Sequence, residues 1–307
     1  MKVLRKQKNR KPEPALLAKI CLILVQNLDL DVKPTISSYL QSFHLITVIV
    51  NAKIGKKGNR MKFRCLGTGS SGNCYLLEDE RECLVIESGL PFKEVKKAID
   101  FEVGKIVGVL VTHEHQDHAK YAKEYIKAGI FVGMSNGTET ALNTMTHPLM
   151  NPGFWYQIDG FNITPFRVVH DAAEPLGFII RHEKIGTMLF ATDTEYIKPN
   201  FKALKLNHIM IECNYSQKII DSRVNQGDTD KGLRDRVLQS HMELETCKSF
   251  IQANKTSSLY NVCLLHLSDG NSNEEQFKNG IKQIIGAGTE VFVADKGLEI
   301  VLDLCPF

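Results

Sequence analysis

The sequence lacks several features that would place it in a specialised class. None of its eight cysteines forms a C-x-x-C pair, and it contains no internal repeat and no low-complexity tract. The absence of repeats argues against solenoid and propeller architectures. Several cysteines lie instead in apolar, strand-like runs, where a thiol behaves as a small hydrophobic side chain. This cysteine usage favours a reduced, cytoplasmic protein.

The sequence also lacks a segment that is predicted to span a membrane. The apolar stretch Ala15–Val25 is interrupted by Lys19 and is shorter than the roughly 20 residues that a transmembrane helix needs. Basic residues precede this stretch, as in a signal peptide, but no small-residue cleavage site follows it. We therefore predict no membrane partner.

Neither sign of charge is in large excess. The formal net charge is only +3, so composition alone does not indicate a protein that binds nucleic acid. Hydrophobic residues make up 43% of the chain, which is an ordinary globular value and permits a sizeable core. A chain of 307 residues is compatible with one large α/β domain.

The chain divides near Met61. Residues 1–60 contain two basic runs, Lys2–Lys11 and Lys53–Arg60, with a predicted helix at 16–26 and a predicted strand at 43–50. They contain no recognisable motif. We interpret residues 1–60 as a basic extension of unknown role, which is either an appendage or a mis-assigned upstream start, and residues 61–307 as the core domain.

Hydrophobic periodicity in the core domain predicts alternating strands and helices. The predicted strands cover residues 63–66, 73–77, 83–86, 106–111, 130–132, 163–169, 177–181, 187–191, 208–211, 262–265 and 291–294. The predicted helices cover residues 92–99, 119–126, 138–146, 243–253 and 274–285. Strands dominate the first half of this domain, and helices occur in both halves. This pattern indicates an α/β (α+β) domain in which two sheets pack together with helices outside.

The densest group of metal-binding side chains follows the apolar run Ile106–Val111. There His113, His115, Asp117 and His118 fall within six residues, where a predicted strand ends and a helix begins. On extended backbone, alternate side chains face the same way, so His113 and His115 can reach one metal ion. Asp117 and His118 can turn toward a second ion. Imidazole nitrogen and carboxylate oxygen favour zinc, with manganese or iron as alternatives.

Three more residues of ligand type follow predicted strands. His170, Asp193 and His266 come directly after the apolar runs 165–169, 188–192 and 262–265. Each signal is weak alone, because a histidine can simply cap a strand and an aspartate often occupies a turn or a helix N-cap. Together they place His, Asp and His just beyond three strands, where functional residues concentrate.

This order of motifs resembles the metallo-β-lactamase fold superfamily of hydrolases. The resemblance implies a four-layer αββα sandwich with two divalent metal ions at one edge of the paired sheets. Carried over by position, the first ion would be held by His113, His115 and His170. The second would be held by Asp117, His118 and His266, with Asp193 bridging both. A hydroxide activated by two such ions is a nucleophile at neutral pH, because the metals lower the pKa of bound water.

Further motifs are similar to the WalJ/YycJ group of this superfamily, whose studied members are implicated as DNA exonucleases. The motifs are the glycine-rich loop Gly67–Asn73 and the segments 170–175, 191–194 and 266–273. Backbone N–H groups of the loop could meet a phosphate. We therefore expect Ser70, Ser71 and Asn73 to contact the substrate, although a plain hairpin turn would also explain this loop.

Asp117 and His241 are the predicted catalytic residues. In the tRNA-maturing relatives, a histidine at the position of His241 is thought to protonate the leaving oxygen, a proton that a phosphodiester leaving group needs. The segment Ser240–Glu243 is expected to start a helix. Arg236 precedes it and could clamp a phosphate, although a solvated basic face is the alternative.

The chain also departs from the family pattern. Glu87 stands where the family usually has an aspartate, and its longer side chain should still orient a ligand histidine. The segment Glu212–Tyr215 reads Glu-Cys-Asn-Tyr, where the family has Glu-Ser-Asn-His. Because the expected ligands are all present, we retain the prediction of a hydrolase.

The leading functional prediction is a metal-dependent phosphodiesterase with a nucleic-acid substrate, namely a DNA exonuclease. An endoribonuclease similar to RNase Z is the first alternative, although the chain has no long Gly/Pro-rich arm for gripping tRNA. A thioester or lactone hydrolase similar to glyoxalase II is the second, because it uses the same ligands. A non-enzymatic binding module is disfavoured, because such relatives usually lose ligands.

Overall fold

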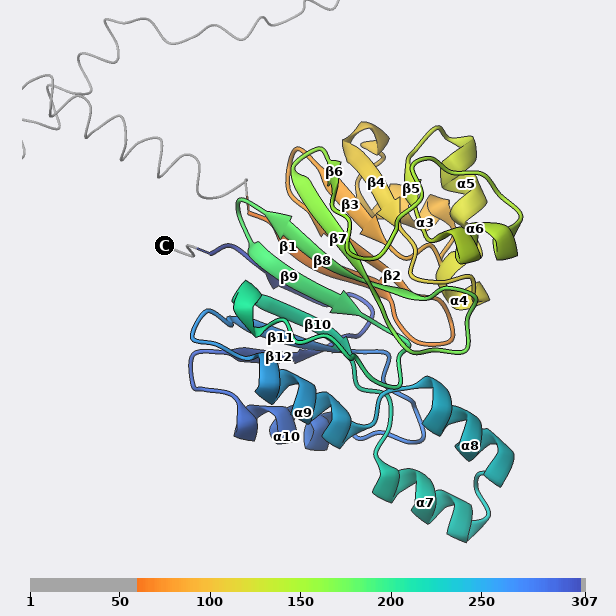
Figure 1. Ribbon diagram of the computed structural model, residues 1–307, viewed down its shortest axis with the longest axis vertical. Helices are drawn as coiled ribbons and strands as arrows, with labels where there is room; N and C mark the ends of the chain where they lie inside the picture. Colours follow the sequence, from red (N-terminus) through yellow and green to blue (C-terminus); the bar gives the residue numbers. More distant parts are fainter. Residues whose placement is uncertain (1–59, 305–307) are drawn as a thin grey trace, which may run out of the picture. The chain divides into compact units, whose positions relative to one another are not determined.

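The computed structural model describes residues 60–304 (Figure 1). The predicted extension lies outside this range except for Arg60, as do the helix and the strand predicted within it. The division of the chain into residues 1–60 and 61–307 therefore stays a prediction.

The first of two mixed sheets has six strands in the order β13-β1-β2-β3-β4-β5. Its strands are β1 (Lys62–Gly67), β2 (Cys74–Glu78), β3 (Cys83–Ile86), β4 (Ile106–Leu110), β5 (Val132–Gly133) and β13 (Glu299–Val301). Strands β3, β4 and β5 are parallel, whereas β1 is antiparallel to β2 and β13.

The second sheet has seven strands in the order β12-β11-β10-β9-β8-β7-β6. They are β6 (Tyr156–Ile158), β7 (Phe161–Arg167), β8 (Leu176–His182), β9 (Gly186–Ala191), β10 (His208–Glu212), β11 (Asn261–Leu265) and β12 (Glu290–Val293). Strands β9 to β12 are parallel. Their carboxyl ends therefore emerge at one edge of the sheet, which is where ligand-binding residues gather in parallel sheets.

Helices flank both sheets (Figure 1). Helices α3 (Phe92–Ala98), α4 (Gln116–Ala119), α5 (Ala122–Lys127) and α6 (Asn136–Leu142) accompany the first sheet, and α9 (Leu244–Asn254) and α10 (Glu274–Ile284) accompany the second. Helices α7 (Gln217–Gln226) and α8 (Lys231–Ser240) project from the sandwich as a pair. Two short 3-10 turns are η1 (Val103–Lys105) and η2 (Lys202–Leu204). No helix in residues 60–304 is long and apolar enough to cross a membrane.

Three apolar cores separate the four layers. Alternate residues of β2 show the arrangement, because Tyr75 and Leu77 pack between the sheets whereas Cys74 and Leu76 pack under α3 and α5. A third core lies between the second sheet and helices α9 and α10. Each fully buried large side chain stabilises the fold by about 1.5–3 kcal/mol. The αββα prediction is confirmed, and the cysteines at positions 65, 74, 83, 213, 247 and 263 are buried, unpaired members of these cores.

Three helix predictions differ from the structure. The helix predicted at 119–126 is divided between α4 and α5. The helix predicted at 138–146 covers 136–142, because the Ser135 side chain accepts the Thr138 N–H at its start and Asn143 adopts a left-handed conformation at its end. The prediction that Ser240–Glu243 starts a helix is wrong. Helix α8 ends at Ser240, and α9 begins only at Leu244, with Glu243 as its N-cap.

Candidate metal centre

The candidate site lies at the edge of the sandwich where strands of both sheets end. The His113–His118 segment leads from β4 into α4, and His170 follows β7. Asp193, Glu212 and His266 stand at the ends of β9, β10 and β11, which are neighbouring parallel strands. The register of these strands therefore brings residues together that are far apart in the sequence.

His113, His115 and His170 form the first group of potential ligands. One ring nitrogen of each lies within 4.8 Å of the others, and His170 Nε2 is 3.2 Å from His115 Nδ1. The opposite nitrogen of His170, Nδ1, is 2.8 Å from the Ser240 carbonyl oxygen. This contact fixes the ring with Nε2 directed at the group, as carbonyl partners do for metal-binding histidines.

His113 provides the observation that tests whether a metal fits. Its Nδ1 lies 2.9 Å from the Thr112 hydroxyl, but its Nε2 is buried without a hydrogen-bond partner. A buried polar atom without a partner is costly unless something else satisfies it. Burial also holds the pKa of His113 well below its ordinary value, so the ring is in the neutral form that binds metals. The donor set therefore fits a divalent ion.

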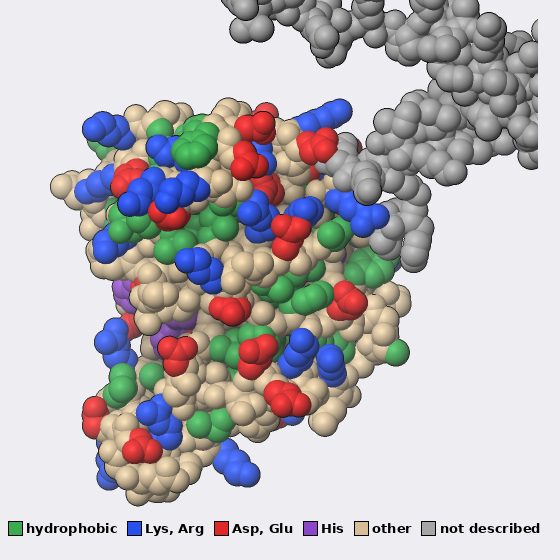
Figure 2. Space-filling view, turned by 180° about the vertical axis from the view of Figure 1, so that it is seen from behind, with side chains coloured by type: hydrophobic (Ala, Val, Ile, Leu, Met, Phe, Trp, Pro, Cys, Tyr) green, Lys and Arg blue, Asp and Glu red, His purple; other side chains and the backbone are tan. Residues whose placement is uncertain are grey.

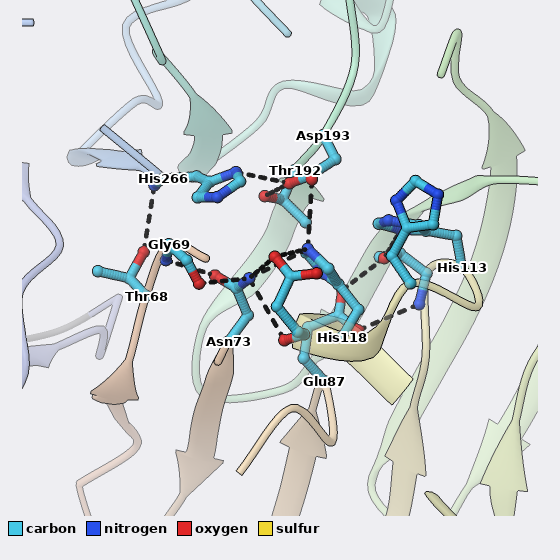
Figure 3. A network of polar contacts seen from close by, with 12 residues as sticks. Thr68, Gly69, Asn73, Glu87, His113, His118, Thr192, Asp193 and His266 are labelled. Atoms are coloured by element: carbon cyan, nitrogen blue, oxygen red, sulfur yellow. Dashed lines mark hydrogen bonds and ion pairs between the residues drawn. The ribbon is translucent and has the colours of Figure 1, made fainter. Parts of the chain in front are cut away.

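Asp193 lies between the remaining histidines (Figure 3). Its Oδ2 is 3.3 Å from His118 Nε2 and 3.8 Å from His170 Nε2. Its Oδ1 is 2.7 Å from His266 Nδ1. Burial would raise the pKa of Asp193, but His118 and His266 hold it well below its usual value. A carboxylate in contact with three ligand-type histidines stands where a bridging ligand is expected.

All seven predicted ligands meet at this edge, and His113, His115 and His170 form one group, as predicted. Two further sets of ligand atoms lie within 4.8 Å of one another. One consists of His113, His118 and Asp193, and the other consists of Asp193, Glu212, His241 and His266. Asp117 belongs to neither set, although its Oδ2 is 3.4 Å from His118 Nε2. The assignment of each ligand to an ion remains a prediction.

Glu87 and Asn73 support His118 from two sides (Figure 3). Glu87 Oε1 accepts the Thr112 hydroxyl at 2.6 Å and lies 3.3 Å from His118 Nδ1. The Asn73 amide lies 3.0 Å from His118 Nε2 and accepts the Gly69 N–H. Asn73 is fully buried, so we propose that it positions His118 instead of contacting substrate.

Three residues of the site have a strained backbone. Glu87, Asp193 and His266 have positive φ angles of 69°, 46° and 53°. Such angles are unfavourable for residues other than glycine and persist where the surrounding structure enforces them. These φ angles could not be predicted from the sequence, because they depend on the packing around each strand end.

Glu212 belongs to the site, although sequence reasoning recognised it only as part of the Glu212–Tyr215 motif. It is fully buried, and its Oε1 lies 2.6 Å from His241 Nδ1 and 3.3 Å from His266 Nδ1. Burial would lower the pKa of His241, but the Glu212 carboxylate raises it above its ordinary value. Its place in the site could have been predicted, because Glu212 directly follows the predicted strand 208–211. The three candidate ligands at strand ends follow their strands in the same way.

The residues that were predicted to contact the substrate lie on separate parts of the fold. Ser70 and Ser71 are exposed in the loop between β1 and β2. Arg236 is exposed on α8, one turn before Ser240. Figure 2 shows histidine side chains reaching the surface beside the lobe formed by α7 and α8. The structure thus leaves the site accessible, while the roles of these side chains in substrate binding remain predictions.

Comparison with known families agrees with this geometry. The family model of the metallo-beta-lactamase superfamily matches residues 67–243, which is more than half of the chain. The chain belongs to this superfamily.

Relatives and solved structures extend the comparison. This metallo-beta-lactamase superfamily chain is 24% identical over 242 residues to exodeoxyribonuclease YycJ of Bacillus anthracis, covering 73% of the chain and 89% of the relative. It is 26% identical over 235 residues to exodeoxyribonuclease WalJ of Streptococcus pneumoniae serotype 2, covering 70% and 84%. The fold is similar to that of the metallo-beta-lactamase fold protein YhfI from Bacillus subtilis, with a TM-score of 0.60, 16% identity and coverage of 79% and 99%. Human tRNase Z, short form, gives a TM-score of 0.53 at 16% identity, with the same coverage.

These findings confirm the predicted superfamily, the resemblance to the WalJ/YycJ group, the αββα fold and a hydrolase of the metallo-beta-lactamase type. The similarity to solved structures shows the fold alone, because their sequences are far below 25% identity.

Proposed function

We propose that the protein is a metal-dependent phosphodiesterase that degrades DNA as an exonuclease. The observation that carries this proposal is the convergence of Asp193 with the histidines of both sheets, next to the buried Glu212–His241 pair. The names of the two relatives, both exodeoxyribonucleases, favour DNA as the substrate.

The ligand set would hold two divalent ions, with zinc favoured and manganese or iron as alternatives. His113, His115 and His170 would bind one ion, and Asp117, His118 and His266 the other, with Asp193 between them. When bound, such ions polarise a phosphoryl oxygen and lower the pKa of coordinated water.

His241 is the residue that we propose as the proton donor to the leaving oxygen. Its Nδ1 is held by Glu212, so Nε2 is the nitrogen left for proton transfer. The His241 ring lies 5.2 Å from the His266 ring and 5.7 Å from the His170 ring, beside the proposed metal ligands. A group fixed in this way contributes about 10²- to 10⁴-fold to such reactions.

The proposal is tested by incubating the full chain, loaded with Zn²⁺ or Mn²⁺, with three substrates. These are end-labelled linear DNA, a structured RNA and a small thioester. We expect progressive shortening of the DNA from its ends, with little hydrolysis of the thioester. Cleavage of the RNA alone would point to an endoribonuclease, and cleavage of the thioester alone would refute a phosphodiesterase.

A further inference from the structure

The outer face of β7 and β8 contains a pocket that the candidate metal centre does not use. Its volume is about 480 Å³, which lies within the range of small-ligand sites. In Figure 1, α9 and α10 lie beside β10 to β12, whereas β7 and β8 are left without a covering helix. The residues that matter for its chemistry are Phe166, Ile179, Phe201, Leu204, Arg167 and Arg181.

One wall of the pocket is aromatic and apolar. The rings of Phe166 and Phe201 lie 4.9 Å apart with an interplanar angle of 57°. Ile179 on β8 belongs to the same apolar cluster, and Leu204 of η2 packs against it. Flat, apolar walls of this kind suit an aromatic ring that can stack or make edge contacts.

The charged side chains of the pocket, Arg167 and Arg181, are cationic. Arg181 is half-buried, and its guanidinium makes no ion pair or hydrogen bond within residues 60–304. Arg167 has a side chain that is 70% exposed and lies 3.4 Å from Glu174. The adjoining segment 196–205 contains three lysines and no acidic residue. A partly desolvated arginine without a partner is unfavourable by itself, so the pocket is suited to an anionic group.

The pocket is joined to the candidate site by two short segments. Arg167 stands three residues before His170, so their Cα atoms are at most ~11 Å apart. Phe201 belongs to the segment that follows Asp193. A strand of nucleic acid bound at the metal centre can therefore reach the near end of the pocket at Arg167, and Arg181 lies farther along β8, opposite Asn162.

We infer that this pocket binds one nucleotide of single-stranded nucleic acid, a short distance along the strand from the phosphate that is cleaved. The base would lie against Phe166 and Phe201, and a backbone phosphate would pair with Arg181. Aromatic stacking combined with cationic phosphate contacts is the usual means of binding single strands. This inference rests on the proposed function, because it assumes that the site acts on a nucleic-acid strand.

The experiment measures binding of the full chain to a fluorescein-labelled, nuclease-resistant phosphorothioate 12-mer of thymidine by fluorescence anisotropy. We expect Arg181→Met to raise the Kd about tenfold. Arg167→Met should raise it by a smaller factor, and this position is exposed and lies outside the apolar cores. The matched control is Arg81→Met, in the turn between β2 and β3, which removes an exposed arginine elsewhere and should leave the Kd unchanged.

A blunt duplex of the same length provides the decisive comparison, because a paired base cannot enter the pocket. Equal effects of Arg181→Met on duplex and single strand, or equal Kd values for the Arg181 and Arg81 variants, would overturn the inference. Hydrolysis is measured separately with unmodified DNA. If the wild type degrades no nucleic acid, the proposed function fails, whereas the anisotropy comparison still decides whether the pocket binds a strand.

Discussion

At the scale of single residues, the site is built from histidines whose two ring nitrogens have different neighbours. His170 turns Nδ1 to the Ser240 carbonyl, and His118 turns Nδ1 toward Glu87. The other nitrogen of each ring faces the Asp193 carboxylate. These outward contacts set the orientation of each ring, so residues outside the candidate ligand set contribute to the geometry of the site.

Replacing Asp193 and replacing His241 should have different effects on metal binding and activity. We expect Asp193→Ala to lose metal and nuclease activity together, because its carboxylate touches His118, His170 and His266. His241→Ala should retain metal but lower kcat by about 10²- to 10⁴-fold. Metal content by elemental analysis and nuclease rates on the same preparations check both outcomes.

The matched control for these variants is His147→Ala, which removes an exposed histidine outside the site. It should keep both metal and activity. A His241→Ala protein that loses its metal would show that His241 is a ligand and not a proton donor. An Asp193→Ala protein with full activity would refute the metal centre.

His208, which lies outside the site, is expected to make the stability of the protein depend on pH. It is fully buried, and burial lowers its pKa from 6.5 to about 4. The unfolded chain therefore binds more protons than the folded one between pH 4 and 6.5, so the free energy of unfolding falls as the pH decreases through this range. The loss amounts to about 3 kcal/mol by pH 4.

Urea unfolding of the wild type and of His208→Gln, measured from pH 7 to pH 4, isolates this contribution. The other histidines titrate in both proteins, so the difference between the two curves reports His208. The wild type should lose about 3 kcal/mol more than the variant. Parallel curves would mean that His208 is protonated in the folded protein as readily as in the unfolded one.

Three candidate metal ligands could be proposed from the sequence because each follows an apolar run that reads as a strand. His170, Asp193 and His266 all obeyed this rule, and the structure places both histidines beside Asp193. Glu212 obeyed it too but was noted only as part of the Glu212–Tyr215 motif, since a glutamate indicates a metal ligand less strongly than a histidine does. The burial of Asn73 could not be predicted, because it arises from contacts with Gly69 and His118 across separate segments.

At the scale of elements, close approach of two loops holds the histidine motif in place. The Asn73 N–H donates to the Asp117 carbonyl at 2.7 Å, and the Gly89 N–H donates to the Asn73 carbonyl at 3.0 Å. A Cβ atom at Gly89 would lie 1.8 Å from the Asp117 carbonyl oxygen. The segment after β3 therefore requires glycine so that the motif at the start of α4 can approach.

Gly89→Ala should consequently displace Asp117 and its neighbours. We expect a loss of about 1–3 kcal/mol in the free energy of unfolding, which is typical of overpacking, together with reduced metal content. Gly104→Ala in η1 is the control, because a Cβ there meets nothing within 4 Å, and it should change stability by less than ~0.5 kcal/mol. Equal stabilities of the two variants in urea would contradict this role for Gly89.

The elements that sequence reasoning missed share a physical cause. Helices α7 and α8 each bury only one residue, Ile220 and Ser240 respectively, so they carry little of the apolar periodicity by which helices are recognised. Strands β6 and β13 have three residues each, which is too short for alternation to be read. Strands in which every residue is buried, such as β10 and β11, were predicted at nearly their observed bounds.

At the scale of the whole molecule, charge is divided unevenly along the chain. The first sixty residues contain twelve Lys and Arg residues but three Asp and Glu residues. The rest of the chain consequently has a formal net charge of −6, although the chain as a whole is at +3. A domain of this sign needs local cationic groups, or the basic extension, to hold a polyanion.

We therefore expect deletion of residues 1–60 to weaken DNA binding and to change its dependence on salt. Each phosphate contact on single-stranded DNA contributes about −0.7 to the slope of log K against log salt concentration. If the extension contacts two or three phosphates, its removal should flatten the slope by about 1.4–2.1. Anisotropy titrations of both proteins between 50 and 200 mM salt, about the range over which such contacts are resolved, give the two slopes. Identical slopes would assign DNA binding to the domain from Met61 onward, and the cationic pocket beside β7 and β8 would then have to supply most of the attraction.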